Sequence, residues 1–167
     1  MKTKVHITVI YEATLERAFK TPMLCDVTKV HTGYGLMPKI IDVVNDSDWG
    51  KPGSSKGVIA AKSISFKGGL ASTDHVLARV ENDYWHICVD DFQAWMLGLY
   101  KFEGIWETTQ LEKGRVQVDY TYHLHANQPL FYPFVWLFSK LFWKRYMVHV
   151  TENIRSLIAN DEPYMYN

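Results

Sequence analysis

Alternation of apolar and polar residues dominates the first three quarters of the chain and predicts a protein built mainly from strands. The apolar residues of the first segment are Val5, Ile7, Val9 and Tyr11. Their two-residue period is that of a half-buried strand, so we expect a strand over residues 4–12. Thr14 suits a helix N-cap, and a short helix is expected after it, limited by Pro22. Residues 24–49 favour one or two further short helices, and the apolar run 40–44 fits either a helix or a strand.

A loop rich in Gly, Pro, Ser and Asp follows at residues 46–55, and the pattern after it is that of consecutive hairpins. Strands are expected over residues 57–66, 70–80, 84–91, 96–111 and 115–125. In the last two strands the even positions form the more apolar face, which we expect to point inward.

The period changes to that of a helix at Pro129 and stays helical to Ala159, with no glycine between them. Pro133 is expected to separate an entry turn from the main helix. The first half of this helix is apolar on all sides and the second half is amphipathic. Residues 1–160 are therefore expected to form one domain, with residues 161–167 as a flexible tail.

Composition agrees with a globular domain and excludes several classes of protein. The chain has 167 residues, of which 47% are hydrophobic and 22% charged, which is too apolar for a disordered protein. Eighteen Lys plus Arg balance eighteen Asp plus Glu, so no net field favours nucleic acid. Cys25 and Cys88 lack the spacing of a zinc or redox motif.

We expect neither a secretory leader nor a membrane span. The segment after Met1 alternates, whereas a signal peptide has a continuous apolar core, and we therefore expect a cytoplasmic protein. The longest uncharged run lies between His125 and Lys140, shorter than the roughly 20 residues that cross a bilayer.

The order of elements predicts an α+β fold in which a curved antiparallel sheet of six to seven strands wraps around a long C-terminal helix, with two short helices after the first strand. The chain resembles the START-like superfamily (SRPBCC proteins, helix-grip fold), in particular its bacterial polyketide cyclase/dehydrase-like branch. The segments that carry the resemblance are Val5–Glu12 followed by Leu15–Phe19, the loop Trp49–Gly53, the passage from Asp74–Val76 to Tyr84–His86, and Phe131–Met147. The resemblance implies an apolar cavity for lipids, polyketides or aromatic ligands, and only some members are enzymes.

Aromatic residues make up 14% of the chain, and many fall on the faces expected to point inward. The predicted cavity wall consists of Tyr100, Phe102, Trp106, Tyr120, Tyr122, Phe134 and Phe138. Gly98 and Gly104 on the same strand would leave room for a ligand or let the sheet bend. The same rings would also suit a filled core.

Three residues are candidates for acid/base or polarising roles, and no catalytic residue can be assigned among them. Asp74 and His75 supply a carboxylate and an imidazole side by side, and Arg79 is the arginine of the central strands. In cyclase-like relatives a cavity arginine can polarise a carbonyl. The histidines lack metal-ligand spacing, so no metal is expected, and no cofactor is implied.

Three functions remain open on this basis. The first is a non-enzymatic protein that binds or transfers a hydrophobic small molecule. The second is a polyketide cyclase or dehydratase-like enzyme that uses the same cavity, and the third is an interaction module with a closed cavity. Lys140, Lys144 and Arg145 flank bulky aromatics, which leaves transient membrane contact open, and an exposed aromatic stripe would equally suit a homodimer.

Overall fold

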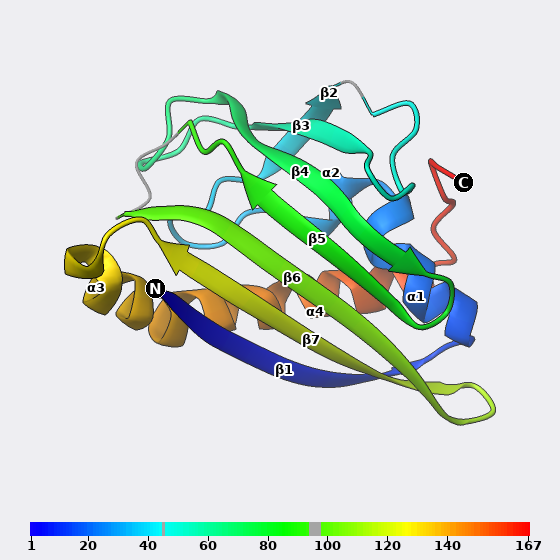
Figure 1. The fold of residues 1–167 in the computed structure, drawn as a ribbon. Helices are drawn as coiled ribbons and strands as arrows, with labels where there is room; N and C mark the ends of the chain where they lie inside the picture. The colour runs from blue at the N-terminus through cyan, green and yellow to red at the C-terminus, as the bar shows by residue number, and fades with distance from the viewer. Residues whose placement is uncertain (45, 94–97) are drawn as a thin grey trace.

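The computed structural model describes residues 1–44, 46–93 and 98–167 and shows a seven-stranded antiparallel sheet curved around helices (Figure 1). The strand order is β1-β7-β6-β5-β4-β3-β2. The strands are β1 (Lys2–Glu12), β2 (Ile40–Val44), β3 (Ser55–Ala60), β4 (Gly69–Val80), β5 (Tyr84–Asp90), β6 (Leu99–Glu112) and β7 (Arg115–Ala126). The first strand pairs with the last, so the segment between them forms the rest of the sheet as successive hairpins.

Helices fill the concave side of the sheet. They are α1 (Leu15–Leu24), α2 (Val27–Val30), the 3-10 turn η1 (Pro129–Phe131), α3 (Tyr132–Phe138), the π-helical turn η2 (Ser139–Trp143) and α4 (Lys144–Ala159). The Thr14 side chain accepts a hydrogen bond from the Arg17 backbone at 3.2 Å, which confirms the predicted cap of α1. Pro22 lies inside α1, two residues before its end. The predicted helix-grip arrangement is confirmed.

The C-terminal helix packs its amphipathic half against the sheet. Its buried face includes Met147, Val150 and Ile154, which are separated by three or four residues and therefore lie on one side of α4. Tyr11 of β1 donates its hydroxyl proton to the Thr151 carbonyl at 2.9 Å and ties this helix to the edge of the sheet. The predicted entry turn before Pro133 is present as η1.

Some segments differ from the sequence-based expectation. Residues 40–44, which fitted either a helix or a strand, form β2. The strand predicted over 57–66 ends at Ala60, because Ser63 and Phe66 close a turn through a backbone hydrogen bond of 2.8 Å. The start of the strand predicted over 96–111 lies partly outside the described residues.

The segment predicted as a flexible tail lies against α1 and α2. The Met165 backbone donates to the Leu24 carbonyl at 2.7 Å, and Arg17 donates to the Glu162 carbonyl. Tyr164 and Tyr166 pack against the hydrophobic core. Residues 161–167 therefore contribute contacts to the domain in this structure.

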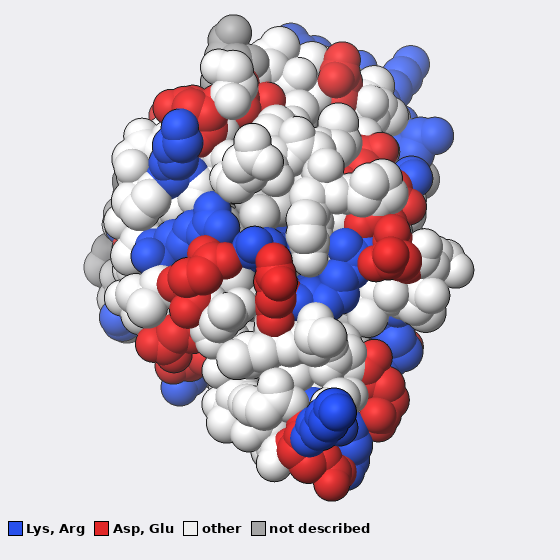
Figure 2. Space-filling model, turned by 90° about the vertical axis from the view of Figure 1, so that its right-hand side faces the viewer, with Lys and Arg blue, Asp and Glu red and all other residues white. Residues whose placement is uncertain are grey.

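Charges of both signs alternate over the end of the molecule that carries α1 and the β6–β7 turn (Figure 2). No single-sign patch dominates this face, which agrees with the formal net charge of zero. Within the described residues, none of the helices has the length and the apolar character needed to cross a bilayer.

Candidate ligand-binding cavity

A cavity of about 370 Å³ lies between the concave face of the sheet and the helices. The sheet supplies Val58, Ile87 and Phe102 to its wall, and α4 supplies Met147 and Val150 from the opposite side. Ile87, Phe102, Met147 and Val150 also belong to the hydrophobic core cluster. The volume falls in the range of about 300–1,000 Å³ that is usual for small-molecule sites.

Four of the seven residues predicted as cavity wall line this cavity. Phe102 comes from β6, Tyr120 and Tyr122 come from β7, and Phe138 comes from the last turn of α3. The alternation along β7 places both tyrosines on the concave face, as the sequence pattern predicted.

Tyr100 lies elsewhere, because a β-bulge interrupts the alternation of β6. The register shifts between Leu99 and Lys101, and Tyr100 is the extra residue. Leu99 is buried, whereas Tyr100 is 48% exposed and its ring contacts His125 on the outer face. A bulge reverses the direction of the side chains before it, and the sequence pattern gave no sign of this one.

Trp106 and Phe134 also lie outside the cavity wall. Trp106 shares the concave face with Phe102, but it sits beneath α1, where its indole nitrogen donates to the Ala18 carbonyl at 3.2 Å. It therefore belongs to the filled core. Phe134 is 55% exposed on α3, because the helix turns Val135 toward the interior instead.

The hydroxyls of Tyr120 and Tyr122 form a pair 2.5 Å apart. One hydroxyl donates to the other, so the proton of the accepting hydroxyl remains free for a third group. Burial raises the pKa of both phenols far above the usual range, and they stay protonated. Gly104 on β6 makes room for this pair, since a Cβ there would lie 3.0 Å from the Tyr122 ring.

Lys56 and Asp74 bring two ionisable groups into the apolar cavity. They are opposite one another in the register of β3 and β4, and both line the cavity. Lys56 is 4% exposed, and its ammonium lies 3.9 Å from the centre of the Trp49 ring. Within the described part of the chain, neither side chain forms a hydrogen bond or an ion pair at 4.0 Å or less.

Burial changes the pKa of both groups toward the neutral form. Desolvation raises the pKa of Asp74 to about 6, although the nearby Lys56 charge acts in the opposite direction. Desolvation likewise lowers the pKa of Lys56, against the opposing effect of Asp74. Two such groups without a protein partner provide a hydrogen-bond acceptor and a donor for a bound molecule.

Sequence reasoning included Asp74 and missed Lys56. The missed signal was the alternation of β3, in which Lys56 shares its face with Val58 and Ala60, both buried. A lysine at the inward position of a half-buried strand rarely lies in the interior by chance, because burying its charge is costly.

A second polar pair lies across the cavity. The Nδ1 atom of His31 is 2.6 Å from the hydroxyl of Tyr146, and both residues line the cavity. Burial, assisted by the charge of Lys56, lowers the pKa of His31 to about 4, so its ring is neutral at pH 7. His31 was not among the sequence candidates, because it lies in a short irregular segment between α2 and β2.

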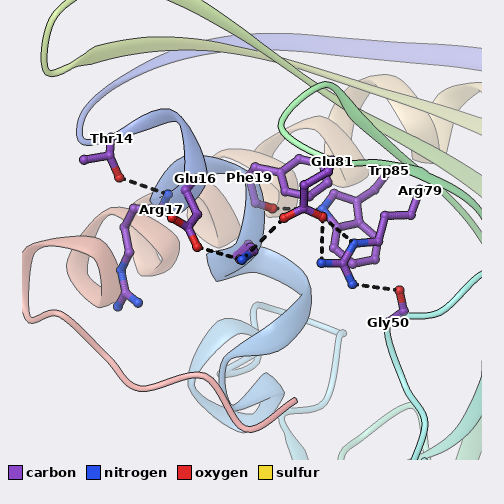
Figure 3. A network of polar contacts seen from close by, with 9 residues as sticks. Thr14, Glu16, Arg17, Phe19, Gly50, Arg79, Glu81 and Trp85 are labelled. Carbon is purple, nitrogen blue, oxygen red and sulfur yellow. Dashed lines mark hydrogen bonds and ion pairs between the residues drawn. The ribbon is translucent and has the colours of Figure 1, made fainter. Parts of the chain in front are cut away.

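Arg79 belongs to a structural network outside the cavity. Its guanidinium pairs with Glu81 at 2.8 Å and donates to the Gly50 carbonyl at 3.1 Å, while it lies over the Trp85 ring (Figure 3). Lys20, a residue of α1, pairs with Glu81 at 3.4 Å. The arginine of the central strands therefore fastens a loop to the sheet, and the structure does not bring it to the cavity.

His75 points to the outer face of the sheet, opposite to its neighbour Asp74. Its Nε2 atom lies 2.9 Å from an Asp90 carboxylate oxygen. With the exposed Asp91, these residues form a group whose ligand atoms lie within 4.8 Å of one another, a geometry that a metal ion could use. The hydrogen bond between His75 and Asp90 accounts for their proximity.

Comparison with known proteins finds the same architecture at very low sequence identity. No protein-family model matches the chain, and no curated protein matches it in sequence. Ara h 8.0201 has a TM-score of 0.71 at 14% identity, over 96% of this chain and 99% of that one. Norcoclaurine synthase from Thalictrum flavum, as a point mutant with a transition-state analogue, has a TM-score of 0.69 at 10% identity, over 96% of each chain. The fold is the START-like helix-grip fold.

A third similar structure is the di-domain ARO/CYC BexL from the BE-7585A biosynthetic pathway. It has a TM-score of 0.68 at 8% identity and covers 95% of this chain, which spans 48% of BexL. The similar structures include a synthase and a protein of a biosynthetic pathway at 14% identity or less, so the shared fold does not by itself assign an activity.

Proposed function

We propose that this protein binds a hydrophobic small molecule with a polar end, such as a lipid, a polyketide or an aromatic compound. The observation that carries the proposal is the apolar cavity of about 370 Å³ with two ionisable side chains, Lys56 and Asp74, that have no partner among the described residues. Burial of apolar ligand surface would supply most of the affinity, at about 25 cal/mol per Å². The cavity polar groups would orient the ligand.

Native mass spectrometry of the purified protein, followed by organic extraction, tests this proposal directly. A co-purifying hydrophobic compound would identify the ligand class. The variant Ala60→Leu places a larger side chain in the cavity wall and should weaken binding of an apolar fluorescent dye. Ala61→Leu changes the next residue, which is outside the wall, and should leave dye affinity unchanged. Equal dye binding by wild type, Ala60→Leu and Ala61→Leu would contradict the proposal.

Catalysis in the same cavity is the second candidate function. The observation that favours it is the pKa of Asp74, raised to about 6, next to the cavity ammonium of Lys56. A carboxylate with this pKa can both accept and return a proton near neutral pH. A cyclase or dehydratase-like reaction on a carbonyl compound would use these properties.

The helix that closes the cavity carries an exposed apolar face, which we propose touches a membrane while the ligand is exchanged. Phe134 and Leu141 are 55% and 56% exposed, and Phe138 between them lines the cavity. Lys140 and Lys144 lie beside this face, and no acidic residue occurs between residues 128 and 151. Apolar side chains bordered by basic ones suit an anionic lipid surface.

Sedimentation with anionic vesicles measures this contact. Phe134→Glu should abolish co-sedimentation, whereas Leu77→Glu on the outer face of the sheet should not. A homodimer would cover the same apolar face, and analytical ultracentrifugation distinguishes it. A dimer that the Phe134→Glu variant dissociates would replace the membrane proposal.

A cytoplasmic location fits the two cysteines. Cys25 and Cys88 are both buried and free. Burial raises the pKa of the Cys88 thiol to about 11, so this thiol is unreactive near neutral pH. Free thiols are typical of reducing compartments.

A further inference from the structure

Lys56 and Asp74 stand apart although their strands bring them together. They are direct partners in the β3–β4 register and face the same cavity, a position from which exposed side chains of opposite charge usually pair. Here their charged atoms are more than 4.0 Å apart, because the Lys56 ammonium lies on the Trp49 ring at 3.9 Å. Trp49 is itself fixed, since its indole nitrogen donates to the Met23 carbonyl at 2.7 Å. Both groups line the cavity, so a ligand bound in it can reach each of them.

The two groups restrict the chemistry of the ligand. A hydrocarbon in this cavity would leave a buried ammonium and a buried carboxyl without partners, which costs free energy. A ligand that engages both groups must present an acceptor to Lys56 and a hydrogen to Asp74. A carbonyl compound with a hydrogen on its adjacent carbon does this, because its oxygen accepts from Lys56 and the polarised C–H, a weak donor, faces Asp74 as a transferable proton.

We infer that the cavity binds an enolisable ketone or aldehyde and catalyses proton transfer at the carbon next to its carbonyl, with Asp74 as the base and Lys56 as the oxyanion partner. This inference rests on the proposed function, because it requires the cavity to bind a small molecule.

The proton transfer balances without any further reactant. The Asp74 carboxylate takes the proton from the α-carbon, and the electron pair of that C–H bond forms the carbon–carbon double bond of an enolate. The carbonyl π electrons move to oxygen, where the Lys56 ammonium donates a hydrogen bond to the developing negative charge. Return of the proton from Asp74 to carbon regenerates the carbonyl compound. If the Asp74 proton first exchanges with solvent, deuterium enters the ligand.

The apolar surroundings favour this step. Charges interact more strongly in the apolar cavity, so the ammonium stabilises an enolate more than it would in water. The Tyr120–Tyr122 pair leaves one hydroxyl proton free to bind another ligand oxygen. Desolvation also makes the ionised Asp74 a stronger base.

Deuterium exchange into 1-tetralone, an aryl ketone with one enolisable position, tests the inference by NMR in heavy water. The wild-type protein should accelerate exchange by roughly 100-fold over buffer. Asp74→Asn and Lys56→Gln should each lose most of this acceleration while saturation-transfer signals still show bound ketone. Asp83→Asn and Lys62→Gln, at exposed positions away from the cavity wall, are the matched controls and should exchange like wild type.

Binding of an apolar dye to the same samples distinguishes a missing proton-transfer activity from a missing ligand-binding cavity. Wild-type protein that binds dye and ketone without accelerating exchange would overturn the inference and leave the proposed function intact. Protein that binds the dye but rejects the ketone would overturn the inference as well. Protein that binds neither would overturn both, and acceleration that survives in Asp74→Asn and Lys56→Gln would show that other groups are responsible.

Discussion

At the residue scale, burial raises the pKa of Asp74 and lowers the pKa of His31. Both line the cavity, and each is disfavoured in its charged form. For Asp74 the folded-state pKa of about 6 exceeds the unfolded value, so folding is penalised at pH above 6 and the penalty disappears toward pH 4. For His31 the folded-state pKa of about 4 is below the unfolded value, so stability is lost as the pH falls from 6.5 toward 4.

These opposite pKa shifts predict that the stabilities of Asp74→Asn and His31→Gln depend on pH differently from that of wild type. The free energy of unfolding of Asp74→Asn should exceed that of wild type at pH 7, by about 3 kcal/mol at most, and the difference should vanish near pH 4. The free energy of unfolding of His31→Gln should instead rise relative to that of wild type as the pH falls below 6.5. Urea unfolding between pH 4 and 7 measures both curves, and differences that do not change with pH would contradict the two shifts.

The tyrosines of the predicted wall give a second test at this scale. Tyr122→Phe removes one hydroxyl of the Tyr120–Tyr122 pair and should weaken the binding of a polar-ended ligand by about 0.5–1.5 kcal/mol. Tyr100→Phe is the matched control, because that ring lies on the outer face. Titration of each variant with the extracted ligand compares the affinities, and a larger loss for Tyr100→Phe would mean that the cavity is wrongly located.

At the scale of elements, β6 and β7 shape the cavity wall through one bulge and one glycine. The bulge at Tyr100 turns that ring outward, and Gly104 lets the Tyr122 ring lie close to the sheet. The close approach leaves no free space, since a Cβ at Gly104 would also lie 3.1 Å from Ile87. Two strands thus fix where the tyrosine hydroxyls sit.

Gly104→Ala should therefore disturb the cavity more than the small size of the added methyl group suggests. The added methyl group must displace the Tyr122 ring or Ile87 by a few tenths of an ångström, and overpacking of this kind costs about 1–3 kcal/mol. We expect a lower thermal unfolding midpoint together with weaker dye binding, measured by calorimetry and fluorescence titration. Loss of stability with unchanged dye affinity would show that the ring does not move.

At the scale of the whole molecule, Arg79 links the sheet, the loop before β3 and α1. Its side chain reaches Gly50 and Glu81, and Lys20 continues the contact to Glu16 on α1 (Figure 3). The network lies where α1 crosses Trp85, and none of its charged side chains lines the cavity. Its role is to hold the two layers together.

Arg79→Met should lower stability and leave ligand binding unchanged. Removing the guanidinium leaves the Gly50 carbonyl without this donor and removes the ion pair with Glu81, for a loss of about 1–3 kcal/mol. Urea unfolding gives the loss and dye titration gives the affinity. A large fall in affinity without loss of stability would instead favour the carbonyl-polarising role suggested by the sequence.

The sequence by itself determined the order of elements and most of the architecture. Alternation in residues 4–12 and 115–125, and the helical period after Pro129, are local signals that need no distant contact. They were sufficient to predict the curved sheet, the closing helix and the inward direction of Tyr120 and Tyr122. Asp74 was also identified as a candidate, although its facing was not.

Tertiary structure decided what depends on register and on distant neighbours. The bulge that turns Tyr100 outward arises from pairing with β7, and the π-helical turn at Ser139–Trp143 forms where the helix meets the sheet. The pKa values of Asp74 and His31 follow from the walls around them, which belong to other elements. A side chain's direction follows from local periodicity, but its solvation depends on everything packed around it, and only the folded chain fixes that.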